Sequence, residues 1–101
     1  MNGKGGYVYI LTNTHHTVLY IGVTAHLFSR IYDHRTRRYK NSFTDKYQLT
    51  KLVYYEPHDL IEPAIEREKQ LKDWSRRRKE TLVAGMNPEW RDLWEDIKDW
   101  F

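Results

Sequence analysis

The sequence YVYILTNTHHTVLYIGV, residues 7–23, contains two short runs of β-branched and aromatic residues. The runs 7–12 and 17–23 flank a turn-prone segment, Asn13-Thr14-His15-His16, and this pattern predicts an antiparallel β-hairpin. Successive side chains alternate between the two faces of a strand. One face therefore carries Val8, Ile10, Leu19 and Ile21, and the other carries Tyr7, Tyr9 and Tyr20. The hairpin combines an aliphatic face suited to a core with a tyrosine face that is a candidate functional surface.

The sequence after the hairpin predicts a helix, a polar loop and a third strand. Thr24 is expected to cap a helix that extends to about Tyr39, with Leu27, Ile31 and Phe28 facing the core. Residues 41–46 form the expected polar loop. The third strand is predicted over 48–56, with Leu52 and Tyr54 on one face and Val53 and Tyr55 on the other.

Three further helices are predicted from capping signals. The first starts near Asp59 or Pro63 and ends at Trp74, since proline suits the first turn. The second follows a Ser75 cap and ends near Ala84, before Gly85. Asn87-Pro88 is expected to open a last helix over residues 88–101.

These elements predict an α/β (α+β) fold, a small sandwich with a three-stranded, mainly antiparallel sheet flanked by helices. The element order is β-β-α-β-α-α-α. A length of 101 residues suits one domain spanning 1–101, with residues 1–6 as a flexible, glycine-containing N-terminus. The four tryptophans are interpreted as packing the terminal helices onto the body rather than stacking on bases.

Composition narrows the classes of function. The chain has no cysteine, which excludes disulfides, thiolate chemistry and cysteine-ligated zinc. No apolar run approaches the roughly 18 residues of a membrane span, and the start lacks the apolar core of a signal peptide. A cytoplasmic location without membrane association is the expectation. Among the five histidines, adjacent His15 and His16 are interpreted as turn residues, and a zinc site is not expected.

The net charge of +3 is unevenly distributed. Segments 26–46 and 66–80 are rich in lysine and arginine, whereas the tail 89–101 is acidic. A basic side with an acidic end suits a protein that lays one side on a polyanion. The alternative is that the basic helix faces are merely solvated.

Glu68 is the most informative single residue. Ile61, Ile65, Glu68 and Leu71 follow helical spacing, so a carboxylate interrupts an apolar stripe. Burying a carboxylate requires a partner charge or a metal. The alternatives are therefore a metal ligand and a buried salt bridge, for which Arg30 and Arg67 are candidate partners.

Arg30 and His34 are four residues apart, so one helical face presents both. This pair could equally be part of a solvated basic face. The strand tyrosines could likewise be no more than good strand formers.

Tyr7-Val8-Tyr9 and Tyr20-Ile21-Gly22 resemble the two halves of the GIY-YIG motif, in the right order. Tyr9 and Tyr20 are eleven residues apart, a spacing typical of that superfamily. Arg30 stands ten residues beyond Tyr20, where the family has its catalytic arginine, and His34 follows where members often have a histidine or tyrosine.

The rest of the chain resembles the short, single-domain bacterial branch of the same superfamily. Arg67-Glu68-Lys69 is similar to the segment that carries the metal-binding glutamate. Further similar segments are Phe43-Thr44, Lys46-Tyr47, Asn87-Pro88-Glu89-Trp90 and Asp92-Leu93. Two positions depart from the pattern: Tyr7 replaces the first glycine of the motif, and Val23 stands where DNA-repair members have a lysine that assists the catalytic tyrosine. Lys46 or His34 is a candidate substitute for that lysine.

The resemblance implies a divalent-metal-dependent endonuclease that acts on nucleic acid, with DNA as the expected substrate. Glu68 would hold one Mg²⁺ or Mn²⁺, bound weakly without substrate. Arg30 would stabilise the transition-state charge, and Tyr20, helped by Tyr9 and His34, would orient or deprotonate the water. The residues expected to contact nucleic acid are Arg35, Arg37, Arg38, Lys46 and Asn87. Asn87 could equally be only a helix cap.

Two other functions fit the sequence less well. One is a nucleic-acid-binding module without cleavage, although such a module has no need for a carboxylate beside phosphate. The other is a protein-interaction domain that docks through its acidic, tryptophan-bearing tail.

Overall fold

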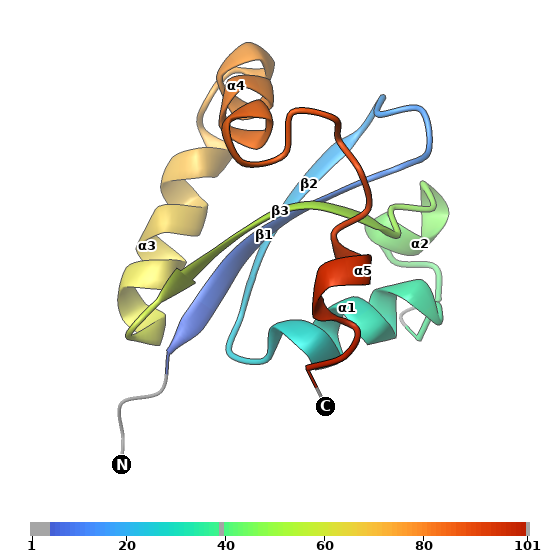
Figure 1. Cartoon of the computed structure of the whole chain (residues 1–101), viewed down its shortest axis with the longest axis horizontal. Coiled ribbons are helices and arrows are strands. Elements are labelled where there is room, and N and C mark those ends of the chain that lie inside the picture. Colours follow the sequence, from blue (N-terminus) through green and yellow to red (C-terminus); the bar gives the residue numbers. More distant parts are fainter. Residues whose placement is uncertain (1–4, 39, 101) are drawn as a thin grey trace.

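The computed structural model describes residues 5–38 and 40–100 and has the predicted class of fold (Figure 1). Three strands form one sheet, and helices cover both of its faces. The elements in chain order are β1 Gly6–Thr12, β2 Leu19–Thr24, α1 Leu27–Arg35, α2 Phe43–Lys46, β3 Lys51–His58, α3 Ile61–Lys72, α4 Arg76–Met86 and α5 Trp94–Ile97. The strands adopt the order β2-β1-β3 with both pairings antiparallel.

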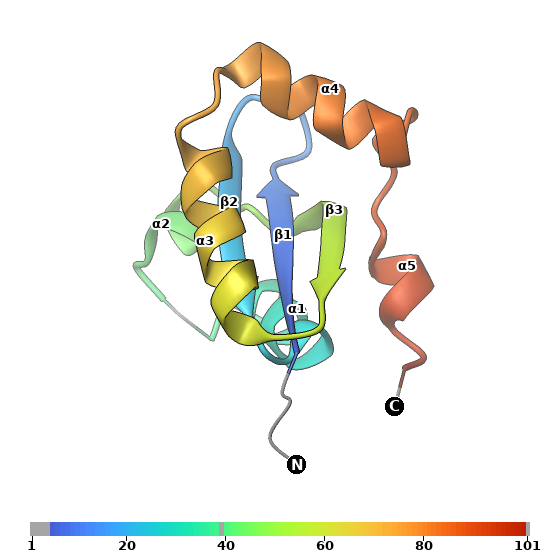
Figure 2. The same ribbon diagram turned by 90° about the vertical axis from the view of Figure 1, so that its left-hand side faces the viewer.

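The predicted hairpin is confirmed. β1 pairs with β2 in a continuous register that places Tyr9 opposite Gly22 and Leu11 opposite Tyr20. The turn keeps the predicted polar character, with Asn13 Oδ1 accepting hydrogen bonds from the backbone N–H groups of Thr17 and Val18. Figure 2 shows β1 between the other two strands, with α3 in front of the sheet and α1 behind it.

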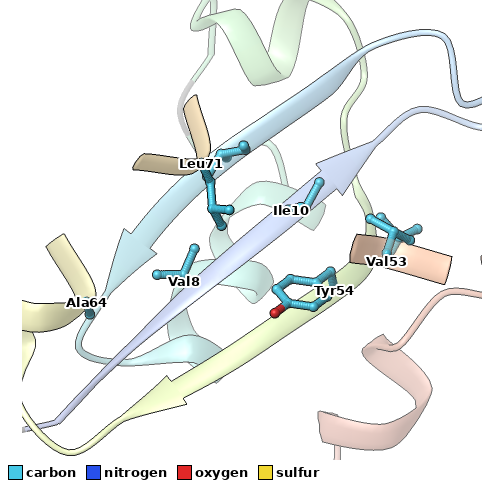
Figure 3. Packing of buried hydrophobic residues seen from close by; sticks show 8 residues of the cluster. Val8, Ile10, Val53, Tyr54, Ala64 and Leu71 are labelled. Atoms are coloured by element: carbon cyan, nitrogen blue, oxygen red, sulfur yellow. The ribbon is translucent and has the colours of Figure 1, made fainter. Parts of the chain in front are cut away.

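The two faces of the sheet separate as the alternation predicts. Val8, Ile10 and Ile21 pack with Ala64 and Leu71 of α3 and with Val83 of α4, as Figure 3 shows in part. The opposite face packs against α1 and α5. Its buried members are Tyr9, Leu11, Leu27, Ile31, Leu49, Leu52, Leu93 and Ile97. The tyrosine face is thus partly a second core.

The predicted alternation in the third strand is wrong because β3 contains a bulge. Leu11 pairs with Leu52 and Ile10 pairs with Tyr54, which leaves Val53 as an extra residue. A bulge shifts the period-2 pattern by one residue. Val53 and Tyr54 consequently lie in the core cluster with α3 and α4, whereas Leu52 lies in the cluster with α1 and α5. The strand also runs from 51 to 58 rather than from 48 to 56.

The first helix is shorter than predicted. It starts at Leu27, because Thr24 Oγ1 accepts the backbone N–H of His26 at 3.0 Å and forms a turn ahead of the helix. It ends at Arg35, and the predicted end at Tyr39 falls on a residue outside the described ranges. The expected polar loop contains the extra helix α2, capped by Ser42 Oγ, which accepts the Asp45 N–H at 3.2 Å.

The prediction of a helix over residues 88–101 is wrong. Among the described residues of this segment, 88–100, the one helix is α5, with four residues, and Phe101 lies outside the described ranges. Leu93 N–H donates to the Leu52 carbonyl at 2.7 Å, and Asp92 Oδ1 accepts the Leu52 N–H at 3.2 Å. These bonds tie the segment to the outer edge of β3. A backbone N–H donates to one acceptor at a time, so this edge pairing competes with helix formation.

The helices before this segment agree better with the sequence. Ser75 caps α4 as predicted, its Oγ accepting the Arg78 N–H at 3.2 Å, and α4 continues through Gly85 to Met86. The predicted flexible segment 1–6 is wrong at Gly6, which opens β1, while residues 1–4 lie outside the described residues. No helix within the described ranges is long and apolar enough to span a bilayer.

The tryptophans pack against the body, as expected. Trp74 lies beneath the guanidinium groups of Arg67 and Arg78, and the Trp90 ring lies 5.0 Å from the His16 ring in a tilted arrangement. Trp94 stacks on Phe28, and Trp100 contacts Tyr7 and Tyr55.

Candidate active site

Tyr9 lies at the centre of the tyrosine face and is fully buried. Its ring crosses directly over Gly22 on the neighbouring strand. A Cβ atom at position 22 would lie 2.4 Å from both Cζ and Oη of Tyr9. Gly22, in the second half of the motif, must therefore be a glycine, because the ring of Tyr9, in the first half, occupies the space that a side chain would need.

Gly22→Ala is expected to destabilise the protein by about 1–3 kcal/mol, because the added methyl group overpacks a buried ring. The Tyr9 ring cannot shift away from the added methyl group, since it is fully buried and its hydroxyl lies within hydrogen-bond distance of His34. Urea unfolding followed by circular dichroism measures the effect. The matched control is Gly85→Ala in α4, where a Cβ meets nothing within 4 Å. That control should gain about 0.5–1 kcal/mol from helix propensity. Equal stability of Gly22→Ala and wild type would contradict the contact.

His34 connects Tyr9 to the loop after α1. Its Nε2 lies 3.3 Å from Tyr9 Oη and its Nδ1 lies 3.1 Å from Thr44 Oγ1. Burial, and secondly the positive charge of Arg30, lowers the pKa of His34 to about 4. A neutral imidazole has one donor and one acceptor nitrogen, so His34 fixes the hydroxyl orientations of Tyr9 and Thr44 relative to each other.

This burial predicts a pH dependence of stability. The pKa of His34 is lowered from 6.5 in the unfolded chain to about 4 in the folded one, so the unfolded state binds more protons between these values. The free energy of unfolding should therefore fall as the pH drops from 6.5 to 4, by an amount on the order of 2–3 kcal/mol from this residue. The measurement is urea unfolding of wild type and His34→Gln across this range. The variant should have a shallower slope, while His15→Gln, in the exposed turn, should keep the wild-type slope. Identical slopes for all three proteins would rule out a buried neutral His34.

A cavity of about 240 Å³ opens beside this relay. It brings together residues from β2, α1 and the α2 region: Tyr20, Arg30, His34, Ser42, Phe43 and Thr44. The Tyr20 ring lies 6.3 Å from the Tyr9 ring and 6.2 Å from that of His34, centroid to centroid. Four of the five residues expected from the sequence to be catalytic thus meet at one place, with Tyr9 beneath the cavity.

Glu68, the fifth, lies on α3, which packs along β1 and β2. Its side chain is 13% exposed and pairs with Lys72, with 2.7 Å between Oε2 and Nζ. Of the two candidate partners for a salt bridge, Arg67 binds Glu56 instead, at 3.0 Å. The expected stripe is also shifted, since Ile65 is 36% exposed and Ala64 takes its place in the core.

The Glu68 carboxylate, as a single protein ligand, suits a magnesium-like ion rather than zinc. The described residues contain no group of three or more histidine, cysteine, aspartate or glutamate side chains that could hold an ion. A single carboxylate does not suit zinc, which takes three or four protein ligands. It does suit Mg²⁺ or Mn²⁺, which keeps several waters and uses substrate phosphate oxygens. The ammonium group at 2.7 Å shows that a cation fits beside this carboxylate.

The residues expected to bind nucleic acid separate into two groups. Arg35 and Asn87 are held by structural contacts. Arg35 binds Asp92 at 2.7 Å and lies over Trp94, while the Asn87 amide donates to the carbonyls of Val53 and Arg91. Asn87 lines a different cavity, beside Pro88 and Leu93.

Arg37, Arg38 and Lys46 are exposed. Arg37 pairs with Asp45, and Arg38 lies 3.7 Å from Asp33. Arg37 also lines a cavity of about 260 Å³ shared with His34 and Thr44. This part of the basic segment is therefore next to the Tyr20 cavity.

Sequence reasoning missed Thr44 and Lys72. Thr44 had no signal beyond the motif-like pair with Phe43, because its contact with His34 is formed only in the folded chain. Lys72 had one, the i,i+4 spacing from Glu68. The hydrogen bond to Glu68, together with the negative charge of that carboxylate, raises the pKa of Lys72. Of the cations suggested in place of the lysine absent at Val23, His34 is neutral near pH 7.

Comparison with known proteins identifies the family of this chain. The model of the GIY-YIG catalytic domain matches residues 5–81, which contain Tyr9, Tyr20, Arg30, His34 and Glu68. A UPF0213 protein from Syntrophus aciditrophicus (strain SB) is 36% identical over 83 residues, covering 82% of this chain and 93% of that protein. The solution NMR structure of a UPF0213 protein from Bacillus halodurans is similar with a TM-score of 0.56 and 28% identity, covering 88% of this chain and 93% of that one. The chain belongs to the GIY-YIG family, a nuclease-type superfamily.

Proposed function

We propose that this protein is a divalent-metal-dependent endonuclease that hydrolyses phosphodiester bonds in DNA, guided by the backbone or shape of its substrate. The observation that carries the proposal is the shared cavity, in which the side chains of Tyr20 from β2 and of Arg30 and His34 from α1 converge. Membership of a nuclease-type superfamily supports the same chemistry.

Each side chain has a defined task in this proposal. Arg30 donates two parallel hydrogen bonds to the phosphoryl oxygens and stabilises the charge that develops there. Tyr20 orients the attacking water or accepts its proton. The neutral His34 holds Tyr9 and Thr44, which lie on either side of it, and so fixes the wall of the cavity.

Glu68 is the residue that would hold the metal. A bound Mg²⁺ or Mn²⁺ supplies Lewis-acid polarisation of the scissile phosphate. Glu68 contributes a fixed carboxylate, because its side chain is largely covered and lies on a 12-residue helix packed on the sheet.

Binding is expected to depend on the DNA backbone more than on base sequence, since contacts to phosphates position a protein without reading bases. Neutralising about three to five phosphates gives a log–log salt slope of roughly −3 to −4.5. Replacing Arg37 and Arg38 by glutamine should flatten this slope and weaken binding to all duplexes alike. Fluorescence anisotropy across a salt series measures it.

The charge-matched control is the pair Arg77→Gln and Lys79→Gln on α4, in the second basic stretch. If the two double variants change the slope equally, net charge rather than the position of Arg37 and Arg38 explains the effect. Strong discrimination between linear duplexes that differ only in base sequence would contradict backbone recognition itself.

The direct test of function is a cleavage screen on linear, nicked, flapped and branched DNA, and on RNA, with Mg²⁺ or Mn²⁺ and with EDTA. Metal-dependent cleavage of at least one substrate, lost in Glu68→Ala, is the expected result. DNA binding without cleavage under every condition would identify a binding module. Absence of both would leave the acidic tail as the more relevant surface.

A further inference from the structure

Lys72 lies one helical turn after Glu68 on α3, and its ammonium contacts the carboxylate at 2.7 Å. The two side chains differ in exposure: Glu68 is 13% exposed and Lys72 is 53% exposed. The lysine thus reaches the carboxylate from the solvent side, from which a metal ion must also arrive.

We propose that the Lys72 ammonium is the counter-ion of the Glu68 carboxylate in the protein without metal or substrate. It blocks access to the carboxylate and must be displaced before a divalent metal ion binds there. The proposal rests on the assignment of Glu68 as the metal ligand in the proposed function. Lys72 is a positioning residue in this scheme, because it acts through Glu68.

The contacts of the other covered glutamate support this distinction. Glu56 accepts hydrogen bonds from Tyr54 at 2.6 Å and Arg67 at 3.0 Å, and it lies 2.7 Å from His58 Nε2. Its charge is fixed by a network within the fold. Glu68 instead pairs with the end of a flexible, half-exposed lysine.

A half-exposed pair of this kind is weak, because water screens it and the lysine loses conformational freedom. The Lys72–Glu68 pair is strong enough to neutralise a carboxylate that is otherwise largely covered. It is also weak enough to be broken by a divalent metal ion that binds both Glu68 and a phosphate of the substrate. Metal occupancy would in this way be coupled to the presence of nucleic acid.

The displaced ammonium remains close to the site. α3, which carries Lys72, packs along β2, the strand that carries Tyr20. Val23, at the end of β2, packs against the aliphatic core. Lys72 therefore keeps its positive charge on the helix that packs beside the strand of Tyr20.

The test measures metal binding directly in the 101-residue chain without DNA. Mn²⁺ is titrated into ¹⁵N-labelled protein, and paramagnetic broadening of the α3 amide signals gives a site-specific affinity. Lys72→Met should bind Mn²⁺ about threefold to tenfold more tightly than wild type, because the competing ion pair and its repulsion are removed. Lys72→Arg, which keeps the charge, should remain weak.

The matched control is Lys69→Met, which removes the same charge from an exposed position on the same helix. It should change the affinity by less than about twofold, as expected for a solvent-screened charge. If Lys72→Met binds no more tightly than Lys69→Met, the proposal is wrong. The wild-type pattern of amide signals outside α3 verifies that each variant is folded.

A second comparison separates this proposal from the proposed function. Glu68→Gln and the double variant Glu68→Gln with Lys72→Met should both lose the localised broadening. If the broadening persists in both, Glu68 is not the ligand and the metal site of the proposed function fails. If it is lost while Lys72→Met equals wild type, Glu68 stands as the ligand and only the role of Lys72 is overturned.

Discussion

Glu68→Ala is expected to abolish Mg²⁺- and Mn²⁺-dependent cleavage while leaving DNA affinity nearly unchanged. The reason is that the variant removes the one carboxylate assigned to the metal and leaves Arg30 and the exposed arginines in place. Single-turnover cleavage with excess protein measures the first effect. Fluorescence anisotropy in EDTA measures the second.

The control is Glu66→Ala, an exposed glutamate on the same helix, which should cleave like wild type. Glu68→Gln provides a second variant that keeps the shape of the side chain, because alanine also leaves Lys72 without its partner. Undiminished cleavage by both Glu68 variants would remove the proposed metal site. Loss of DNA binding together with cleavage would indicate that Glu68 acts through the structure instead.

Arg30→Lys is expected to lose most activity although the positive charge is retained. A guanidinium presents two parallel donors to phosphoryl oxygens, whereas an ammonium acts as a point charge. Loss of one such transition-state contact lowers the rate by about a hundredfold to a thousandfold. The measurement is the single-turnover rate at saturating protein, which separates the chemical step from binding.

Arg38→Lys is the matched control, since Arg38 is exposed beside α1 and is expected to contact only the backbone of the substrate. It should cleave within a few-fold of wild type. An Arg30→Lys variant that cuts at nearly the wild-type rate would assign Arg30 to electrostatic steering or to structure. Because Arg30 also lies close enough to His34 to lower its pKa, the pH dependence of unfolding shows whether the relay is intact in the variant.

The two halves of the motif illustrate where sequence reasoning succeeds. Period-2 alternation assigned Tyr9 and Ile10 to opposite faces, and both core clusters agree with it. The spacing of Arg30 and His34 placed them on one helical face, and the structure brings both to the Tyr20 cavity. Such patterns are local, so the chain carries them whatever it later packs against.

The errors occur where contacts distant in sequence decide the backbone. Residues 88–93 have a helix-opening signal, yet the free edge of β3 offers Leu52 as a hydrogen-bond partner and the segment pairs with it instead. The bulge at Val53 is likewise set by pairing with β1. Neither partner can be recognised from a window of neighbouring residues.

The sequence by itself therefore determined the hairpin and its two faces, the family and the identity of the candidate catalytic residues. Only the tertiary structure decided which charges are already paired: Arg35 with Asp92, Arg67 with Glu56, and Glu68 with Lys72. The physical reason is range. Alternation and capping act over a few neighbouring residues. Burial lowers the dielectric constant around a charge, but only after segments distant in the sequence have packed over it. That burial determines which partner the charge requires.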